Sequence, residues 1–451
     1  MSENTTVGIL GGGITGLSVA YALQKSGIKA TVYEKSEEVG GAIHSITKKG
    51  FLVEEGPNTL SIRSSKMWNL LDTLGLESQM VKANDVAKKR FIVKNKKPIP
   101  VPMSFSNFLT TPLISSGAKL RLLKEPFVSA SDRDDESVAT FIERRLGRQP
   151  LDYGINPFVS GIYAGDPQKL SIKYTFSMLW EMEQRYGSIT RGMIKKERPK
   201  NRPKRAMISF REGNQVLPNT LADFLDNTPK TSTEILSITK NNYNWVLSGE
   251  APDQPFETEH NCLISTLPTH LLPELFAPEL VNELAKLPYA PVSVLGLGFE
   301  SNQITHPLDG FGMLIPEVEN YKTLGVLFSS TLFPNRAPDG HELLTCFIGG
   351  ARNPELARKS PKELVKIVLR ELSELLQISG DPVFHHHKYW AKAIPQYPVG
   401  YNRYAKEMNN IEKENPGLFF QGNFREGVSV PDCILSGFET AQKVITFIKT
   451  R

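Results

Sequence analysis

Cysteine is scarce in this 451-residue chain, which has only Cys262, Cys346 and Cys433. The three share no CxxC spacing and have no histidine cluster beside them, which argues against a disulfide framework or a zinc site and favours a reducing compartment. The sequence also lacks any run of 18 apolar residues, so we expect no segment that spans a bilayer. Because the N-terminus has no basic region followed by an apolar stretch, we expect the protein to remain in the cytoplasm, where it is made.

A large charge of one sign is absent as well. The formal net charge of +5 is small for this length and does not indicate a nucleic-acid partner. Hydrophobic residues make up 40% and charged residues 22%, as in ordinary globular proteins, and the length allows two or three domains. The consecutive histidines 385–387 lie in a predicted strand, where neighbouring side chains point to opposite faces, so we expect no metal site there.

The first forty residues predict a βαβ unit. Residues 6–10 form a short apolar strand, and residues 11–16, Gly-Gly-Gly-Ile-Thr-Gly, form a tight turn. Residues 17–26 have apolar side chains at helical spacing. Residues 30–33 form a second strand, which ends at Glu34.

This unit has the residues that a dinucleotide pyrophosphate requires. Gly11 allows the sharp turn, Gly13 lets the backbone approach the phosphates, and Gly16 lets the helix and strand pack closely. The helix N-terminus then faces the anion, and Glu34 can accept hydrogen bonds from ribose hydroxyls. The alternative is an ordinary glycine turn, but the order of strand, turn, helix, strand and acidic residue favours a dinucleotide site.

The segment 34–41, which ends in Gly40-Gly41, resembles the second fingerprint of FAD enzymes in the amine oxidase and protoporphyrinogen oxidase superfamily. Where many relatives carry a basic residue after the two glycines, this chain has Ala42, so a flavin contact there would use the backbone. Further blocks resemble the plant-type protoporphyrinogen oxidases, and they follow the family's order along nearly the whole chain. These blocks are residues 55–60, 156–167, 332–338, 347–350, 393–397 and 422–433.

The resemblance implies FAD as the cofactor, and its binding is expected to be noncovalent because no cysteine lies near residues 390–392, where we expect the flavin ring. The residues implied for FAD binding are Gly11, Gly12, Gly13, Ile14, Thr15, Gly16, Glu34, Lys35, Gly41, Ala42, Gly56, Pro57, Asn58, Thr59, Ile235, Trp390, Asn423, Val428, Ser429 and Val430. Ile235 is expected to contact the adenine end through its backbone. Residues 428–430 precede a C-terminal helix whose dipole would favour negative charge on the reduced ring, although an ordinary capped turn is the alternative.

The resemblance also implies a pocket for a porphyrinogen. Gly161 is expected to lie against the flat macrocycle, where a side chain would obstruct it. Leu314, Leu332 and Phe347 are expected to sandwich the ring. Arg90 is expected to hold a propionate bidentately. The plainer alternatives are a turn glycine, core packing and a solvated charge, and no motif identifies a general acid or base.

The activity implied by the resemblance is that of an FAD-dependent oxidase, which converts protoporphyrinogen IX to protoporphyrin IX with molecular oxygen and gives hydrogen peroxide. Coproporphyrinogen III oxidase is the nearest alternative, since it has the same chemistry, and extra basic groups in the pocket would favour it. Another flavin amine oxidase or desaturase is a further alternative. A flavoprotein that binds porphyrin without oxidising it is the alternative from outside the enzymes.

The expected fold is α/β, with a discontinuous Rossmann-like FAD/NAD(P)-binding domain, an inserted α+β substrate domain and a mainly helical membrane-associating domain. The expected ranges are 1–85 with 207–265 and 385–451, then 266–384, and 86–206, respectively. Residues 101–129 mix apolar side chains with Lys and Arg, which predicts peripheral contact with the inner face of a membrane, or else a face that packs internally. Residues 191–205 are basic and interrupted by proline, so we expect a loop there. The sequence leaves open whether the protein is a homodimer.

Overall fold

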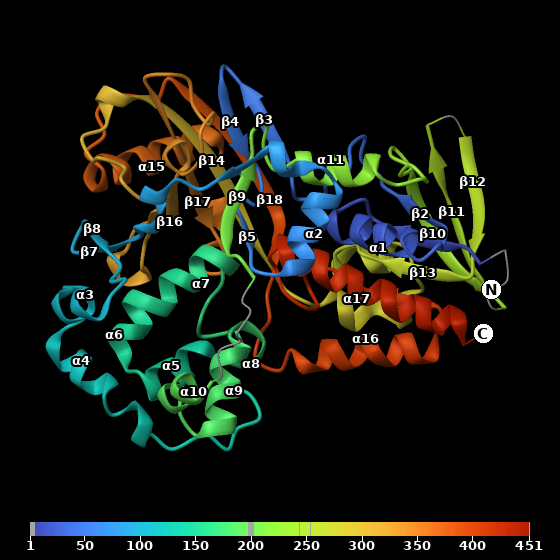
Figure 1. The fold of residues 1–451 in the computed structure, drawn as a ribbon, viewed down its shortest axis with the longest axis horizontal. Helices are drawn as coiled ribbons and strands as arrows, with labels where there is room; N and C mark the ends of the chain where they lie inside the picture. Colours follow the sequence, from blue (N-terminus) through green and yellow to red (C-terminus); the bar gives the residue numbers. More distant parts are fainter. Residues whose placement is uncertain (1–4, 197–202, 243, 253, 451) are drawn as a thin grey trace.

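The computed structural model describes residues 5–196, 203–242, 244–252 and 254–450 (Figure 1). A parallel four-stranded sheet with the order β19-β13-β1-β2 contains the N-terminal βαβ unit. Its strands are β1 (Val7–Leu10), β2 (Ala30–Tyr33), β13 (Cys262–Ser265) and β19 (Leu418–Phe420). The strands expected at residues 6–10 and 30–33 are therefore confirmed, and they pair in one sheet with strands from distant parts of the chain.

Two helices pack side by side against this sheet. They are α1 (Ile14–Gln24) and α17 (Val430–Lys449). They approach closely because Gly437 has no side chain; a Cβ there would lie 3.0 Å from both the Ser18 Cβ and the Thr15 carbonyl oxygen. Cys433, one turn earlier, neighbours Thr15, so the two helices run in the same direction.

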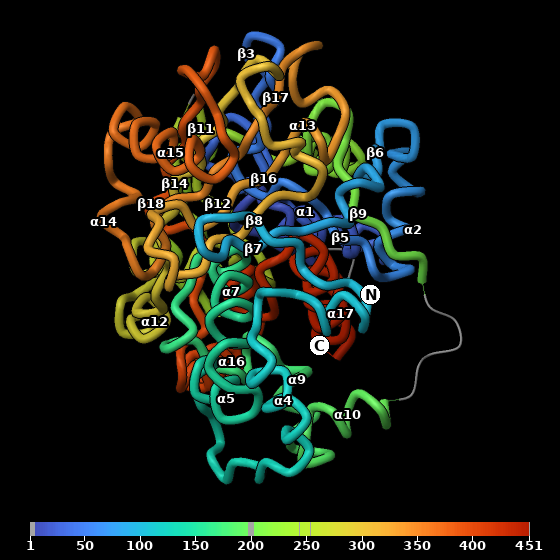
Figure 2. The backbone as a smooth tube through the Cα atoms, turned by 90° about the vertical axis from the view of Figure 1, so that its left-hand side faces the viewer, coloured from blue at the N-terminus to red at the C-terminus, as the bar shows by residue number. Residues whose placement is uncertain are grey.

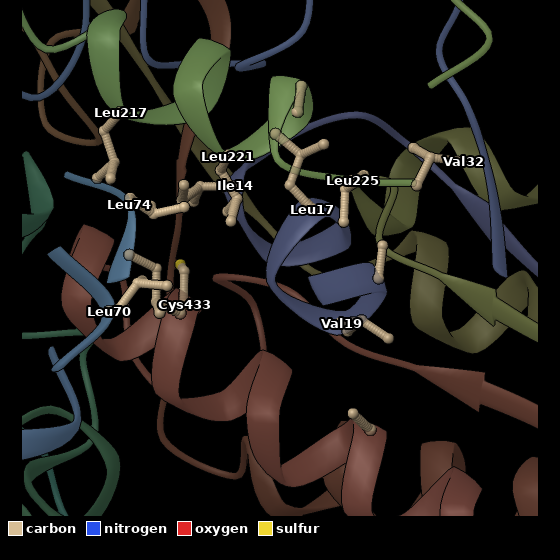
Figure 3. Close-up of a cluster of buried hydrophobic side chains, with 14 of the residues drawn as sticks. Ile14, Leu17, Val19, Val32, Leu70, Leu74, Leu217, Leu221, Leu225 and Cys433 are labelled. Atoms are coloured by element: carbon tan, nitrogen blue, oxygen red, sulfur yellow. The ribbon is translucent and has the colours of Figure 1, made fainter. Parts of the chain in front are cut away.

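An apolar core fills the space around these helices. Figure 3 shows Ile14 and Leu17 of α1 beside Leu221 of α11 (Val216–Asp223), with Cys433 of α17 below them in the view. These side chains are buried, and their burial fixes the helices on the sheet.

A mixed seven-stranded sheet with the order β18-β14-β17-β16-β15-β7-β8 forms the second large unit. Its strands are β7 (Phe91–Lys94), β8 (Lys97–Pro100), β14 (Tyr289–Glu300), β15 (Gly312–Leu314), β16 (Thr323–Phe328), β17 (His341–Gly349) and β18 (Phe384–Pro395). One face is covered by α15 (Pro361–Leu375), which begins at a capping box between Ser360 and Glu363. The other face is turned toward the nucleotide-binding part (Figure 1).

The strand β4 (Phe51–Glu54), paired with β3 (Ser45–Lys48), crosses that second face. Two glycines of β14 make room for it. A Cβ at Gly296 would lie 3.0 Å from the Val53 side chain, and one at Gly298 would lie 2.5 Å from the Phe51 ring. The crossing therefore brings the nucleotide-binding part into direct contact with the large sheet.

The last residue of β4, Glu54, is buried at this crossing. Its carboxylate accepts hydrogen bonds from the Asn214 backbone N–H at 3.0 Å and from the Ser45 hydroxyl at 2.5 Å. It also pairs with the buried Arg336 at 3.3 Å. Burial raises the pKa of Glu54, although Arg336 and these hydrogen bonds act in the opposite direction.

A helical region follows β8. Its helices are α3 (Phe105–Thr110), α4 (Ser116–Leu122), α5 (Val138–Arg145), α6 (Arg148–Pro150), α7 (Asn156–Tyr163), α8 (Ile172–Thr175), α9 (Ser177–Tyr186) and α10 (Ile189–Lys195). The loop expected at 191–205 is wrong at its start, because α10 continues to Lys195; residues 197–202 lie outside the described residues. The proposed domain boundary at residue 86 stays a prediction, and β7 and β8 hydrogen-bond within the seven-stranded sheet.

Smaller elements complete the fold. They are β5 (Leu60–Ile62), α2 (Ser65–Thr73), β6 (Met80–Lys82), β9 (Ala206–Phe210), β10 (Glu234–Asn241), β11 (Asn244–Ala251), β12 (Gln254–His260), α12 (Pro278–Ala285), α13 (Ser329–Leu332), α14 (Pro354–Ala357) and α16 (Asn402–Glu414). Among the described residues, none of the helices combines the length and the apolar character that crossing a bilayer requires.

The helical region is organised around Arg145, whose side chain is 0% exposed. Its guanidinium donates to Glu183 at 2.5 Å, to Glu125 at 3.1 Å and to the Gly187 carbonyl oxygen at 2.7 Å. Glu125 in turn accepts backbone N–H groups from the first turn of α10. Burial raises the pKa of Glu125, but the hydrogen bonds from Ser188 and the start of α10 outweigh it, and the net pKa is lowered.

Replacing Arg145 by methionine should lower the free energy of unfolding by about 3–5 kcal/mol, because the change takes the guanidinium away from the buried carboxylate of Glu125 and leaves that of Glu183 with Arg144 alone. Chemical denaturation followed by circular dichroism measures the effect. Arg148→Met is the matched control, since its ion pair with Asp152 is exposed and should be worth at most about 1 kcal/mol. Equal losses in the two variants would contradict a special role for the buried guanidinium.

Candidate functional site

The N-termini of α1 and α17 point to the same edge of the parallel sheet, because the two helices run in the same direction and β1 leads into α1. The N-cap of α1 is Gly13, with no side-chain cap, and the N-cap of α17 is Ser429. Both helix ends present backbone N–H groups and positive dipole ends, which favour an anion.

The glycine turn at 11–16 has the shape that a pyrophosphate site needs. A Cβ at Gly16 would lie 2.1 Å from the Gly11 carbonyl oxygen, so only glycine allows this packing of helix on strand. A Cβ at Gly13 would meet no atom within 4 Å, which leaves open space in front of the backbone. The Gly40 N–H donates to the Gly12 carbonyl oxygen at 2.9 Å, so the Gly40-Gly41 pair lies against the glycine turn. The residues present therefore fit a dinucleotide.

Glu34 lies beside this turn, at the end of β2. Its carboxylate accepts hydrogen bonds from the N–H groups of Gly12 at 2.7 Å and Ser36 at 2.8 Å. The Thr233 N–H donates to the Glu34 carbonyl oxygen, which brings the start of β10, with Ile235, next to the acid. Lys35 points outward and pairs with Glu234 at 2.6 Å. The structure thus brings Glu34 and the Ile235 segment together at one edge of the turn.

The segment 56–59 packs against Ala42. A Cβ at Gly56 would lie 1.9 Å from the Ala42 carbonyl oxygen, so this contact also requires glycine. The Asn58 side chain donates to the Gly56 carbonyl oxygen at 2.9 Å, and the Asn214 side chain donates to that of Pro57 at 2.7 Å.

Trp390 of β18 reaches the same place from the large sheet. Its indole N–H donates to the Glu55 carbonyl oxygen at 2.7 Å. The turn 428–430 is held from the other side, because the Tyr397 hydroxyl donates to the Asn423 carbonyl oxygen at 2.5 Å and accepts from the Gly427 N–H at 3.2 Å. Four segments that are distant in sequence are therefore joined by direct contacts.

The open face of the seven-stranded sheet continues from Trp390. Across the strands, Leu314, Gly325, Phe347, Val294 and Lys388 are successive partners in one row. Their sequence neighbours face α15 on the other side, so this row lines the face turned toward the nucleotide-binding part. Leu314 and Phe347 are half-buried, and Gly325 between them adds no side chain. The row is mostly apolar, and Val294 within it is buried.

The helix α7 lies against this surface, as Figure 2 shows beside β7 and β8. Gly161 of α7 is exposed, and a Cβ there would lie 2.7 Å from the end of the Leu314 side chain. Its φ is not positive, so the helix itself does not require glycine at this position. The alternative interpretation of Gly161 as a turn glycine therefore does not hold, because the residue lies within α7.

Arg90 lies at the edge of the same face. It precedes β7 by one residue, and Ile92 pairs with Leu314, so strand alternation places Arg90 and Ile92 on one side. The Arg90 guanidinium lies 5.1 Å from the centre of the Phe311 ring, and no carboxylate of the described residues is within ion-pairing distance. Its neighbours Lys88 and Lys89 instead pair with Asp85 and Asp309.

Leu332 is placed differently from the other sandwich residues. It is 1% exposed and packs in a small cluster with Val81, Ala87 and Phe333. Its side chain therefore has no surface left for a ligand in this conformation, and core packing describes it better than contact with a ring.

Sequence reasoning missed Glu55. Its carboxylate oxygens lie 2.9 Å from a ring nitrogen of His44, 2.7 Å from a ring nitrogen of His386 and 3.0 Å from the Lys388 ammonium nitrogen. Burial raises the pKa of Glu55, but hydrogen bonds from His386 and Lys388 outweigh it, and the net pKa is lowered. The neighbouring His387 points to the other face and bonds the Ser293 hydroxyl at 2.8 Å. The signal in the sequence was the acid pair 54–55 between an apolar strand and a Gly-Pro turn.

Comparison with known proteins agrees with this geometry. The sequence pattern of the family described as "Flavin containing amine oxidoreductase" matches residues 14–445. Protoporphyrinogen oxidase 2 of Arabidopsis thaliana is 36% identical, over 98% of this chain and 94% of the relative. Coproporphyrinogen III oxidase of Bacillus subtilis is 28% identical, over 98% of each chain.

A solved structure from Exiguobacterium sp. 255-15, named as a candidate protoporphyrinogen oxidase, has a TM-score of 0.80 at 23% identity and covers 98% of this chain and 99% of its own. This match supports the fold. The family pattern spans nearly the whole chain, and the Arabidopsis relative exceeds 30% identity along almost its full length. The chain therefore belongs to the flavin-containing amine oxidoreductases, and within them to the protoporphyrinogen oxidase family.

Proposed function

We propose that this protein is an FAD-dependent oxidase that converts protoporphyrinogen IX to protoporphyrin IX with molecular oxygen and releases hydrogen peroxide. The observation that carries the proposal is the continuity of two surfaces. The glycine turns and Trp390 lead directly into the row of Leu314, Gly325 and Phe347, which ends at the unpaired Arg90. A flat acid with an apolar ring fits the second surface, and a dinucleotide fits the first.

The FAD would be held noncovalently. The backbone at Gly11–Gly16 and the N-terminus of α1 would bind its phosphates, and Glu34 would accept hydrogen bonds from ribose hydroxyls. Residues 56–59, Trp390 and the turn 428–430 would surround its ring. When bound, the flavin would supply the hydride acceptor for oxidation of the porphyrinogen, and molecular oxygen would take up the electrons.

The residues of the chain would then act by positioning the substrate. Leu314 and Phe347 on the sheet and Gly161 on α7 would enclose the macrocycle and exclude water from it. Such fixed orientation contributes to the rate because the reacting atoms no longer have to find each other. We assign no general base, since the pyrrole N–H protons can leave as the ring aromatises.

Arg90 would hold a propionate at one edge of the ring. Its guanidinium is exposed and free of carboxylate partners in the described part of the chain, whereas the ammonium groups of Lys88, Lys89 and Lys388 each pair with a carboxylate. A free guanidinium at one edge matches protoporphyrinogen IX, whose two propionates lie together. Coproporphyrinogen III carries four propionates around the ring, so it would leave more of its charge without a partner.

We also propose that the protein is cytoplasmic and lies peripherally on the inner face of the membrane. The apolar side chains of Phe105, Leu123 and Phe127 are exposed, with Phe127 at 83%. Lys124 lies between the last two, and Ile194 of the neighbouring α10 is also exposed. Exposed apolar groups beside cations favour an anionic lipid surface.

The purified protein should be yellow and should release FAD on acid precipitation. With protoporphyrinogen IX in the absence of oxygen, the flavin absorbance should disappear, and air should restore it with formation of hydrogen peroxide and fluorescent porphyrin. The value of kcat/KM should be at least severalfold higher for protoporphyrinogen IX than for coproporphyrinogen III. The reverse order would reassign the protein as a coproporphyrinogen III oxidase, and inertness toward both would reject the proposal.

Arg90→Ala is the matched test of the substrate assignment. It should raise KM roughly ten- to a hundredfold without changing the FAD content, since a charge-assisted hydrogen bond contributes about 1.5–3 kcal/mol. Lys97→Ala, an exposed cation on the same hairpin, is the control and should leave KM unchanged. Equal kinetics in both variants would place Arg90 among the solvated charges.

Gly161→Val should reduce porphyrinogen oxidation by about a hundredfold while leaving FAD content and melting temperature normal. The added side chain would push Leu314 and displace the ring by about 1 Å, which is enough to cost that factor. Gly154→Val is the control, because a Cβ at Gly154 meets no atom within 4 Å. Full activity of Gly161→Val would show that the macrocycle lies elsewhere, and equal losses in both variants would indicate a helix effect.

Membrane contact predicts that the protein floats with vesicles of anionic phospholipid in a density gradient. Phe127→Ser should weaken binding about tenfold, because burial of a phenylalanine side chain contributes about 1.5–3 kcal/mol. Val383→Ser, an exposed apolar residue before β18, is the control and should bind normally. Absence of binding, or equal losses in the two variants, would contradict the proposal.

A further inference from the structure

A buried carboxylate with three basic partners lies beside Trp390. We call Glu55, His44, His386 and Lys388 the Glu55 cluster. The Glu55 side chain is 6% exposed, and its two oxygens lie 2.7–3.0 Å from nitrogen atoms of the other three. One oxygen is bonded by His386, and the other is shared by His44 and Lys388. Both oxygens of the carboxylate therefore have partners within the cluster.

The sheet and the crossing strand determine where the cluster lies. His386, Lys388 and Trp390 alternate along β18, so all three point to the face that bears Phe347. Glu55 follows β4, which Gly296 and Gly298 allow close to that face. The Lys388 ammonium lies 4.8 Å from the centre of the Trp390 ring.

The charges of the cluster nearly cancel. Glu55 contributes one negative charge and Lys388 one positive charge, while each histidine adds a positive charge only when it is protonated. The other carboxylates nearby are Glu38, 3.7 Å from His44, and Glu54, which is held by Arg336 and Ser45 instead. A change of one charge at Glu55 or Lys388 would therefore shift the net charge beside Trp390 by one unit.

We propose that the Glu55 cluster sets the midpoint potential of the bound flavin, with Lys388 as the cation and Glu55 as the charge that offsets it. Reduction makes the flavin more negative, so a nearby cation stabilises the reduced form and a nearby anion disfavours it. The inference rests on the placement of Trp390 beside the flavin that we propose above. It does not depend on which porphyrinogen the enzyme oxidises.

The test is a reductive titration of the FAD-loaded protein against reference dyes, without any porphyrinogen. Lys388→Met should lower the midpoint potential and Glu55→Gln should raise it. A tenfold change in the reduction equilibrium corresponds to about 30 mV for a two-electron couple. The double variant should return close to the wild-type potential, because it removes one charge of each sign.

Two controls separate charge from packing. Lys388→Arg keeps the cation and should keep the wild-type potential. Lys359→Met removes a lysine that is also ion-paired, to Glu363, but lies on the α15 side of the sheet, and it should shift nothing. If Glu55→Gln does not retain FAD, the comparison of Lys388→Met with Lys388→Arg still tests whether the charge at this position affects the midpoint potential.

Shifts of the same sign in Glu55→Gln and Lys388→Met would overturn the inference, and so would the absence of a shift in Lys388→Met. Equal shifts in Lys388→Met and Lys388→Arg would overturn it as well, since they would reflect packing. Failure of the proposed porphyrinogen chemistry would be seen separately, because the titration contains flavin and dye alone.

Discussion

Two adjacent buried carboxylates at the end of β4 join the nucleotide-binding part to the large sheet. Glu54 is held by Arg336, Asn214 and Ser45, and Glu55 points the other way to Lys388 and two histidines. Breaking a buried ion pair costs about 3–5 kcal/mol, since one charge stays behind without a partner. Any movement of β4 would break both sets of contacts, so the cofactor segments and the apolar sheet face keep a fixed relation.

Because the cofactor segments and the apolar sheet face are held in fixed positions, the proposed site would need few polar groups to position a ligand. The expected pocket residues Leu314 and Phe347 belong to a sheet with a packed helix behind it, and Gly161 belongs to a helix that lies against the sheet. A surface built on rigid elements holds a flat ligand by shape. In the proposed complex, one charged group at its edge, Arg90, would orient the acid.

The sequence predicted the structural features whose residues lie close together in the chain. The βαβ unit, the glycine turn and Glu34 depend on spacing within 28 residues, and the structure confirms the strands and the turn. The Glu55 cluster was missed, since His386 is 331 positions away and nothing local links the two. Leu332 shows a different limit of the sequence. The family resemblance of residues 332–338 identified the segment, but it did not show that Leu332 is buried among Val81, Ala87 and Phe333, because that burial depends on the tertiary fold. The loop expected from residue 191 was wrong at its start, because α10 begins at the N-cap Ser188 and is also held by Glu125, which lies far upstream in the chain.

The order of strands in the parallel sheet has a consequence for how the protein is made. β1 and β2 leave the ribosome well before β19 and α17, which lie at residues 418–449. Until then, the N-terminal βαβ unit lacks both a strand of its sheet and the helix that packs on α1 through Gly437. Long-range pairing of this kind closes late and leaves apolar surface uncovered in the meantime. The N-terminal βαβ unit must therefore remain soluble until residues 418–449 have been synthesised and can complete its sheet.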